Sequence, residues 1–227
     1  MQADGEPAFD HYGLEGKDRP PIAADWPADI SRPDRTVRSR AAHFEHLLLS
    51  SEPHGFCMEP LDPDTGVSMT SPLPYALITT VDREGRSNAM GASWVTRVSF
   101  KPFLMMVSVG KQRLSHRSIH EQGEFVICYP SAEQEKGALY CGTHPGHAGD
   151  KIARAGLVAV PSTKVRPPTI GDCTVAFECK VTCEYDAGDH TLFVGEVVAV
   201  TGDLNRAKHL FVTTRSKMVA MDQNGNV

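Results

Sequence analysis

Two long runs of alternating residues near the end of the chain constrain the fold more than any other feature. CTVAFECKVTCEY covers residues 173–185 and HTLFVGEVVAVTGD covers residues 190–203, and the segment between them, DAGD, has the composition of a turn. In the first run one face would carry Val175, Phe177, Cys179, Val181 and Cys183, and the other Ala176, Glu178, Lys180 and Thr182. This period of two is typical of half-buried strands. The sequence therefore predicts a long antiparallel hairpin.

Further strands are predicted by apolar segments rich in β-branched and aromatic residues. They cover residues 75–82, 87–100, 103–110 and 124–130. Short helices are expected over residues 113–122, 131–142 and 149–156, and a last apolar run covers residues 209–214. Roughly six or seven mostly antiparallel strands with a few short helices indicate a mainly β protein, a β-barrel with peripheral helices. Strands and helices do not alternate, and neither GxGxxG nor GxxxxGKS/T occurs, so doubly wound and P-loop nucleotide sites have no support.

The chain before the first strand differs in character. Residues 1–73 are rich in Pro, Asp and Gly, which predicts an extended N-terminal arm. Its exception is residues 35–49, where apolar residues recur at helical spacing behind Asp34, a candidate N-cap. This helix would dock on the main body or on a partner subunit. The barrel domain is then expected over residues 74–215, followed by a polar tail over residues 216–227.

Charge and composition exclude several classes of function. The formal net charge of −5 disfavours binding of nucleic acid by the whole surface. No segment approaches the ~20 apolar residues that span a bilayer, and the first residues lack the pattern of a secretory signal. The 6 cysteines are irregularly spaced, which favours reduced thiols over a disulfide framework. We therefore expect a cytoplasmic protein without a membrane partner.

Two segments have the chemistry of a binding site. NAMGASWVT, residues 88–96, combines small residues, hydrogen-bonding side chains and the flat face of Trp94, which suits a planar heterocycle with polar edges. A bulged strand packed closely on its neighbour explains the same residues. SVGKQRLSHRS, residues 108–118, leads from a strand into a helix N-terminus with cations and hydroxyls, which suits a phosphate; a solvated basic loop is the alternative. Only one strand separates them, so a ligand with a ring and a phosphate could touch both.

A metal site is not expected. Cys141, His144 and His147 have ligand atoms at short spacing, but a Gly/Pro-rich loop explains them better. Cys179 and Cys183 would lie ~13 Å apart on a strand, which is too far to chelate one ion.

These segments also carry a resemblance. The order of LPYALITTVDREGRSNAMGASWVTRVSFKPFLMMVSVG, a basic Ser/His helix start, GEFVICYP, GDKIARAGL and GDHTLFVGEVV resembles the flavin reductase-like family, flavoredoxin branch, over residues 74 to about 203. The resemblance implies a Greek-key, antiparallel split β-barrel that binds FMN non-covalently at a homodimer interface and is reduced by NADH or NADPH. It implies flavin contacts from Asn88, Ala89, Ser93, Trp94, Val95, Thr96, Ser108, Val109, Gly110, Arg113, Ser115, His116 and Lys151.

His190 resembles the family's Gly-Asp-His element, which implies a catalytic or orienting role toward nicotinamide or flavin. A hairpin-end residue is the alternative. Cys128 and Ile152 depart from the family pattern, which has Asn and Phe there. The leading hypothesis is an NAD(P)H-dependent flavin oxidoreductase with a monooxygenase or another electron acceptor as partner. The alternatives are a flavin electron carrier or sensor without its own nicotinamide turnover, and a module for another ring-phosphate ligand such as pyridoxal phosphate or deazaflavin.

Overall fold

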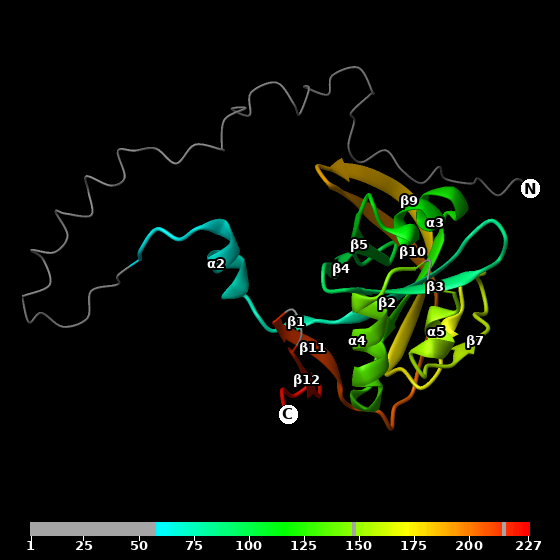
Figure 1. Ribbon diagram of the computed structural model, residues 1–227. Helices are drawn as coiled ribbons and strands as arrows, with labels where there is room; N and C mark the ends of the chain where they lie inside the picture. The colour runs from blue at the N-terminus through cyan, green and yellow to red at the C-terminus, as the bar shows by residue number, and fades with distance from the viewer. Residues whose placement is uncertain (1–57, 147–148, 215–216) are drawn as a thin grey trace, which may run out of the picture. The chain divides into compact units, whose positions relative to one another are not determined.

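The computed structural model describes residues 58–146, 149–214 and 217–227 (Figure 1). The arm helix predicted over residues 35–49 lies outside the described residues. The end of the predicted arm contains a short helix, α2 (Pro63–Ser68), whose N-cap Asp62 accepts a hydrogen bond from the backbone of Thr65. It also contains a short strand, β1 (Leu73–Pro74).

A single antiparallel sheet of seven strands forms the body of the protein, as the sequence predicts. Its strands in chain order are β2 (Ala76–Val81), β3 (Ser87–Ala92), β4 (Val95–Ser99), β5 (Leu104–Gly110), β6 (Glu124–Tyr129), β9 (Val175–Ala187) and β10 (His190–Gly202). The order across the sheet is β3-β2-β6-β9-β10-β5-β4. The long hairpin therefore lies near the centre, with β9 paired to β6 and β10 paired to β5.

The two edges of this sheet are consecutive in the chain. Strands β3 and β4 are the edge strands, and only Ser93 and Trp94 lie between them. A flat sheet of this width would hold its edges about 29 Å apart at ~4.8 Å per strand, whereas a two-residue link spans about 10 Å. The sheet must therefore roll up, and the predicted mainly β, antiparallel split barrel is confirmed.

One predicted strand is divided in the structure. The sequence predicts a single strand over residues 87–100. The structure has two strands there, because β3 pairs with β2 and β4 pairs with β5. The division at Ser93 and Trp94 lets one stretch of chain supply both edges of the barrel. The pairing partners, which the local sequence does not reveal, decide where the break falls.

The short helices lie where the sequence predicts them. Helix α3 (Leu114–Gln122) ends at Gly123, whose φ of 67° is the left-handed conformation that favours glycine. Ser131 and Gln134 form a capping box at the start of η1 (Ala132–Gln134), which continues into α4 (Glu135–Thr143). Helix α5 (Lys151–Arg154) begins at its N-cap Asp150. Helix α3 packs on β2, while α4 and α5 pack on β3 (Figure 1).

Two apolar clusters, one on each face of the sheet, form the core. One contains Ile78, Val107, Val109, Phe125 and Phe193, and the other contains Leu77, Ala89, Val126 and Ala138 with residues of the outer helices. Strand β2 contributes alternate residues to both clusters, so all of its residues are buried. Burial on both faces explains why this segment is a nearly continuous apolar run.

The first half of β9 is buried on both faces, so the prediction of one polar face is wrong here. The sequence predicts Ala176 and Glu178 on the polar face, but both are completely buried. The Glu178 carboxylate accepts hydrogen bonds from the backbone and hydroxyl of Thr163 at 2.9 and 3.0 Å and from the backbone of Lys164 at 2.6 Å. The segment that contains Thr163 and Lys164 covers this face of β9 and stabilises the Glu178 carboxylate. Polar and apolar residues therefore alternate along this part of β9, but buried and exposed residues do not.

The predicted polar tail contains a strand. Strand β12 (Lys217–Met221) pairs with β11 (His209–Thr214), which in turn pairs with β1 in a small three-stranded sheet. A separate two-stranded ladder joins β7 (Ala159–Val160) to β8 (Thr169–Ile170). Among the described helices none is long and apolar enough to cross a membrane.

Candidate functional site

The start of helix α3 is joined to strand β3 by a buried hydrogen bond. The side-chain amide of Asn88 donates to the hydroxyl of Ser115 at 2.9 Å. Both residues are buried, with 6% and 1% exposed surface, and the amide oxygen of Asn88 has no hydrogen-bond partner. Buried amide oxygens are rarely unpaired in folded proteins, so this atom is an acceptor available to a ligand that carries a donor.

A second group of residues lies at the C-terminal end of strand β5. Gly110 pairs with His190 across the β5–β10 ladder, and the ring of His190 lies 5.0 Å from that of Trp94, measured between centroids. Nδ1 of His190 is 2.7 Å from a carboxylate oxygen of Asp189. The hydrogen bond to His190 lowers the pKa of Asp189. This pairing leaves Nε2 of His190 as the ring nitrogen available to a ligand. Trp94 is 54% exposed, which leaves much of its side chain accessible.

The backbone brings these two groups to the same end of the barrel. The amide of Ser108 donates to the carbonyl of Trp94 at 3.0 Å, and the amide of Arg113 donates to the carbonyl of Gly110 at 2.9 Å. The segment around Trp94 and the turn that carries Arg113 therefore meet where β5 passes into α3. A single elongated molecule can contact both.

His116 faces the hairpin rather than β3. Its Nε2 lies 2.8 Å from the hydroxyl of Thr191 on β10, and its ring packs edge-on against Phe193 at 5.2 Å. Burial lowers the pKa of His116, and the neighbouring His120 adds to this effect. Burial therefore disfavours the protonated form of His116 beside the β5 end of the site.

Lys151, for which the resemblance implies a ligand contact, is buried beside the end of helix α4. Its buried ammonium donates to the carbonyl oxygens of Cys141 and His144 at 3.1 and 3.0 Å, at the end of helix α4. Burial lowers the pKa of Lys151, and the nearby charge of Arg113 lowers it further. Lys151 thus caps the end of α4.

Several of the predicted site residues are part of the core. The side chains of Ala89, Val95 and Val109 are buried in the two apolar clusters, so only their backbone can face a ligand. The space beside Gly91 is occupied by the ring of Tyr75, whose hydroxyl would lie 1.8 Å from a Cβ at position 91. At least one small residue of this strand, Gly91, therefore makes room for the protein's own Tyr75 rather than for a ligand.

Three further sequence candidates have accessible side chains. Ser93, Thr96 and Ser108 are partly or fully exposed around the β4–β5 ladder. The two residues that depart from the family pattern, Cys128 and Ile152, are both buried in the outer apolar cluster, with 0% and 2% exposed surface.

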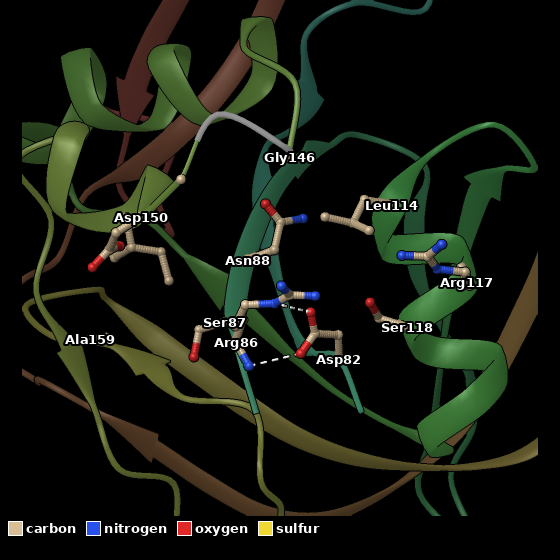
Figure 2. A pocket seen from close by; sticks show the side chains of 12 residues that line it. Asp82, Arg86, Ser87, Asn88, Leu114, Arg117, Ser118, Gly146, Asp150 and Ala159 are labelled. Carbon is tan, nitrogen blue, oxygen red and sulfur yellow. Dashed lines mark hydrogen bonds and ion pairs between the residues drawn. The ribbon is translucent and has the colours of Figure 1, made fainter. Parts of the chain in front are cut away.

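A cavity of about 480 Å³ opens beside the start of α3 (Figure 2). We call it the α3 cavity. Figure 2 shows Leu114, Arg117 and Ser118 of α3 on one side, Asp150 at the start of α5 on the other, and Asn88 of β3 between them. The whole lining consists of Asp82, Arg86, Ser87, Asn88, Leu114, Arg117, Ser118, Gly146, Gly149, Asp150, Ile152 and Ala159.

The charges of the α3 cavity are distributed unevenly. Arg86 binds Asp82 at 2.7 Å (Figure 2) and also binds Glu84 at 2.8 Å, so its charge is compensated. The side chain of Arg117 forms no hydrogen bond or ion pair with any residue that the structure describes. Sequence reasoning missed Arg117, although its position one helical turn after Arg113 is a signal that could have identified it.

Two of the candidate metal ligands, Cys141 and His144, pack against other residues. Cys141 is buried, and burial raises the pKa of its thiol. The ring of His144 stacks on Tyr140 at 3.7 Å between centroids. His147 lies outside the described residues. Cys179 is buried and Cys183 is partly exposed on the same strand.

Comparison with known proteins identifies relatives of the described domain. Residues 68–220 match the family model described as flavin reductase like domain. An NADH:riboflavin 5'-phosphate oxidoreductase of Streptomyces pristinaespiralis is 31% identical over 131 residues, which cover 57% of this chain and 72% of that protein. An NADH-dependent FAD reductase of Streptomyces globisporus is 30% identical over 152 residues, which cover 66% of this chain and 81% of that protein.

The structural comparison agrees with this result. The flavoredoxin of Desulfovibrio vulgaris superimposes with a TM-score of 0.61 at 28% sequence identity, and the match covers 76% of this chain and 94% of that chain. The similarity therefore extends over nearly the whole of that neighbour.

Proposed function

Because the chain belongs to the flavin reductase-like family, we propose that it is an oxidoreductase that binds FMN non-covalently and transfers a hydride to it from NADH or NADPH. We further propose that it works as a homodimer in the cytoplasm. The relatives described above include an NADH:riboflavin 5'-phosphate oxidoreductase, which supports this class of reaction.

The observation that carries the proposal is the meeting of Trp94 and the Arg113 turn at the end of β5. The start of α3 presents free backbone amides and the positive end of the helix dipole, and its first turn contains no acidic residue. Arg113 adds a guanidinium without a carboxylate partner among the described residues. This arrangement suits the 5'-phosphate of FMN, with Arg113 and Ser115 as its anchors.

The ring of the flavin would lie at the Trp94 end. Trp94 supplies an exposed aromatic face, and Ser93, Thr96 and Ser108 supply partly or fully exposed hydroxyl side chains beside it. The unpaired oxygen of Asn88 would accept a hydrogen bond from a ribityl hydroxyl or a ring N–H. When bound, the flavin itself supplies the redox chemistry, and the protein supplies binding and orientation.

His190 would orient the reductant at this end. Asp189 holds one nitrogen of the imidazole, so Nε2 can donate to or accept from an amide or carbonyl group of nicotinamide or flavin. His116 of α3, held by Thr191 of β10, would support the β5 end. Lys151 would act indirectly, since its ammonium binds the end of α4.

The proposed homodimer is supported by an exposed apolar edge. Strand β4 is an edge of the sheet, and Val98, Phe100 and Phe103 are 47%, 73% and 37% exposed on or beside it. The guanidinium of Arg97 lies 4.1 Å from the ring centre of Phe100, which extends this surface. Exposed apolar patches of this kind often mark protein interfaces. Light scattering should give about twice the 24.7 kDa chain mass, and the mass of one chain would contradict a dimer.

A flavin carrier without nicotinamide turnover is the second candidate, favoured by the similarity to a flavoredoxin. In either case a monooxygenase or another acceptor would receive the electrons. Purified protein should show the visible absorbance of a flavin, and stopped-flow mixing with NADH or NADPH should bleach it rapidly. Slow bleaching would favour the carrier, and protein that neither binds flavin nor oxidises NAD(P)H would exclude both candidates.

A further inference from the structure

Two buried thiols outside the proposed flavin site interact with each other. Cys128 belongs to β6, and Cys173 lies just before the start of β9. A hydrogen bond joins the two side chains, and neither cysteine is part of a disulfide. Both belong to the outer apolar cluster. The family pattern has Asn at position 128, so this pair is a feature of the chain rather than of the family.

The backbone holds the two cysteines together. The amide of Ile170 donates to the sulfur of Cys128 at 3.4 Å, and the amide of Thr174 donates to the carbonyl of Tyr129 at 2.9 Å. The turn that carries Cys173 is therefore attached to β6 both before and after this cysteine. Because folding already brings the two thiols together, the entropy cost of closing the intervening loop is met before any reaction between them.

Cys173 has the surroundings of a reactive thiol. The hydrogen bond from Cys128 lowers the pKa of Cys173, and a backbone amide and the charge of Arg206 lower it further, whereas burial and the charge of Asp172 oppose this shift. The guanidinium of Arg206 binds the carboxylate of Asp172, the residue before Cys173, at 3.0 Å. Because the thiolate is the nucleophilic form of cysteine, a hydrogen-bond donor and a nearby cation favour reaction at this sulfur.

The two thiols differ in their accessibility. Cys173 keeps 7% exposed surface, and the residues before it, Gly171 and Asp172, line a cavity of about 470 Å³, which is large enough for a small oxidant. Cys128 is completely buried, and burial raises the pKa of its thiol. An oxidant from solvent therefore reaches Cys173 first, and Cys128 is placed to react with the product.

The other described cysteines lack this combination of contacts. Cys179 is completely buried, and burial raises the pKa of its thiol to about 12. Burial also raises the pKa of Cys141. Cys183 is partly exposed, but its sulfur lies 3.9 Å from the hydroxyl of Thr182, a group that cannot form a disulfide. Oxidation should therefore favour the pair Cys128 and Cys173.

From these observations we propose that Cys128 and Cys173 form a dithiol that reacts with hydroperoxides, with Cys173 as the nucleophile and Cys128 as the resolving thiol. The sulfur of Cys173 attacks one oxygen of hydrogen peroxide, the O–O bond breaks, hydroxide leaves, and Cys173 becomes a sulfenic acid. The sulfur of Cys128 then attacks the sulfenic sulfur. The S–S bond forms, the S–O bond breaks, and the oxygen leaves as water with the proton of Cys128. Together the two thiols lose two electrons and two protons, and one hydrogen peroxide becomes two molecules of water.

Mass spectrometry of the reduced, full-length protein after treatment with hydrogen peroxide tests this inference. The wild-type digest should contain two peptides linked through Cys128 and Cys173. Cys173 and Cys179 share one tryptic peptide, so fragmentation of the linked pair assigns the bond. Cys128→Ser should stop at the sulfenic acid, which dimedone traps, and Cys173→Ser should form neither product. The matched control Cys183→Ser changes a partly exposed cysteine of β9 and should leave the linkage unchanged.

The relative reactivity of the thiols in the wild-type protein provides a second measurement that needs no variant. Alkylation of Cys173 by a small thiol reagent should be at least about tenfold faster than alkylation of the buried Cys179. Circular dichroism verifies that each variant is folded.

Three results would overturn the inference. They are a wild-type protein in which peroxide forms no bond between Cys128 and Cys173, a Cys173→Ser variant in which Cys128 is oxidised as fast as before, and equal rates of alkylation at Cys173 and Cys179. These measurements follow neither flavin binding nor NAD(P)H oxidation, so none of them bears on the proposed function. Reduced flavin that reacts with dioxygen produces hydrogen peroxide, so the proposed function would supply the oxidant.

Discussion

The side-chain amide of Asn88 donates a 2.9 Å hydrogen bond to the hydroxyl of Ser115, a residue 27 positions later in the chain. This buried bond ties the strand that leads to Trp94 to the first turn of α3, which carries Arg113. It therefore fixes the relative position of the two halves of the proposed flavin site.

Removal of the Ser115 hydroxyl should destabilise the protein. In Ser115→Ala the amide of Asn88 loses its partner while its oxygen is already unpaired, and a buried unsatisfied polar group costs about 1–3 kcal/mol. Thermal unfolding should show a midpoint lowered by about 2–4 °C for each kcal/mol. Ser118→Ala removes a hydroxyl of similar burial from the same helix and should have a smaller effect. Equal effects would show that the bond to Asn88 has no special role.

Replacement of Lys151 should weaken the end of α4. Lys151→Met keeps much of the buried stem but leaves the carbonyl groups of Cys141 and His144 without their donor. The free energy of unfolding should fall by about 1–3 kcal/mol. The matched variant Lys136→Met, at an exposed lysine of α4, should be nearly neutral. A stable Lys151→Met protein in denaturant titrations would contradict the structural role of this ammonium.

His116 should make the stability of the protein dependent on pH. Burial lowers the pKa of His116 below 6.5, so the unfolded chain binds a proton more readily than the folded protein. His120 and Lys111 add to this effect and Glu184 opposes it. Stability should therefore decrease as the pH falls through 6.5 toward the lower folded pKa.

Denaturant titrations between about pH 5 and 8 measure the contribution of His116. His116→Gln should reduce the loss of stability at acidic pH relative to the wild-type protein. His144→Gln, at an exposed histidine, should leave the profile unchanged. A profile that His116→Gln does not alter would show that other groups, such as the partly buried His209, dominate.

The pair Asp189 and His190 should act on the nicotinamide step. His190→Ala should lower kcat/KM for NADH or NADPH by more than tenfold, which corresponds to about 1.4 kcal/mol. Asp189→Asn should have a smaller effect in the same direction, because it alters the group that holds Nδ1. Steady-state kinetics with saturating flavin measure both. Unchanged kcat/KM in His190→Ala would show that the imidazole only terminates the hairpin.

Local signals in the sequence predict much of the fold. The alternation of residues 173–203 predicts the hairpin, and Ser131 and Gly123 mark the start of one helix and the end of another, because capping depends on a few adjacent residues. The break at Ser93 and Trp94 is different. It is decided by pairing with β2 on one side and β5 on the other, and these partners are distant in the chain.

The candidate site shows the same distinction. The sequence predicts that the Trp94 segment and the Arg113 turn lie close together, because only one short strand separates them. It does not reveal that Tyr75 fills the space beside Gly91, or that Lys151 binds the carbonyl groups of α4. It also does not reveal the α3 cavity, because α3, β3 and α5 come together only in the folded chain.

The central claim is that Trp94 and Arg113 hold opposite ends of one flavin nucleotide. Titration of riboflavin and FMN against the wild-type protein, Trp94→Leu and Arg113→Gln tests it most directly. We predict that Trp94→Leu weakens binding of both ligands, and that Arg113→Gln weakens FMN by more than tenfold, above ~1.4 kcal/mol, without changing riboflavin. Equal weakening of riboflavin and FMN by Arg113→Gln, or unchanged FMN affinity in either variant, would contradict the claim.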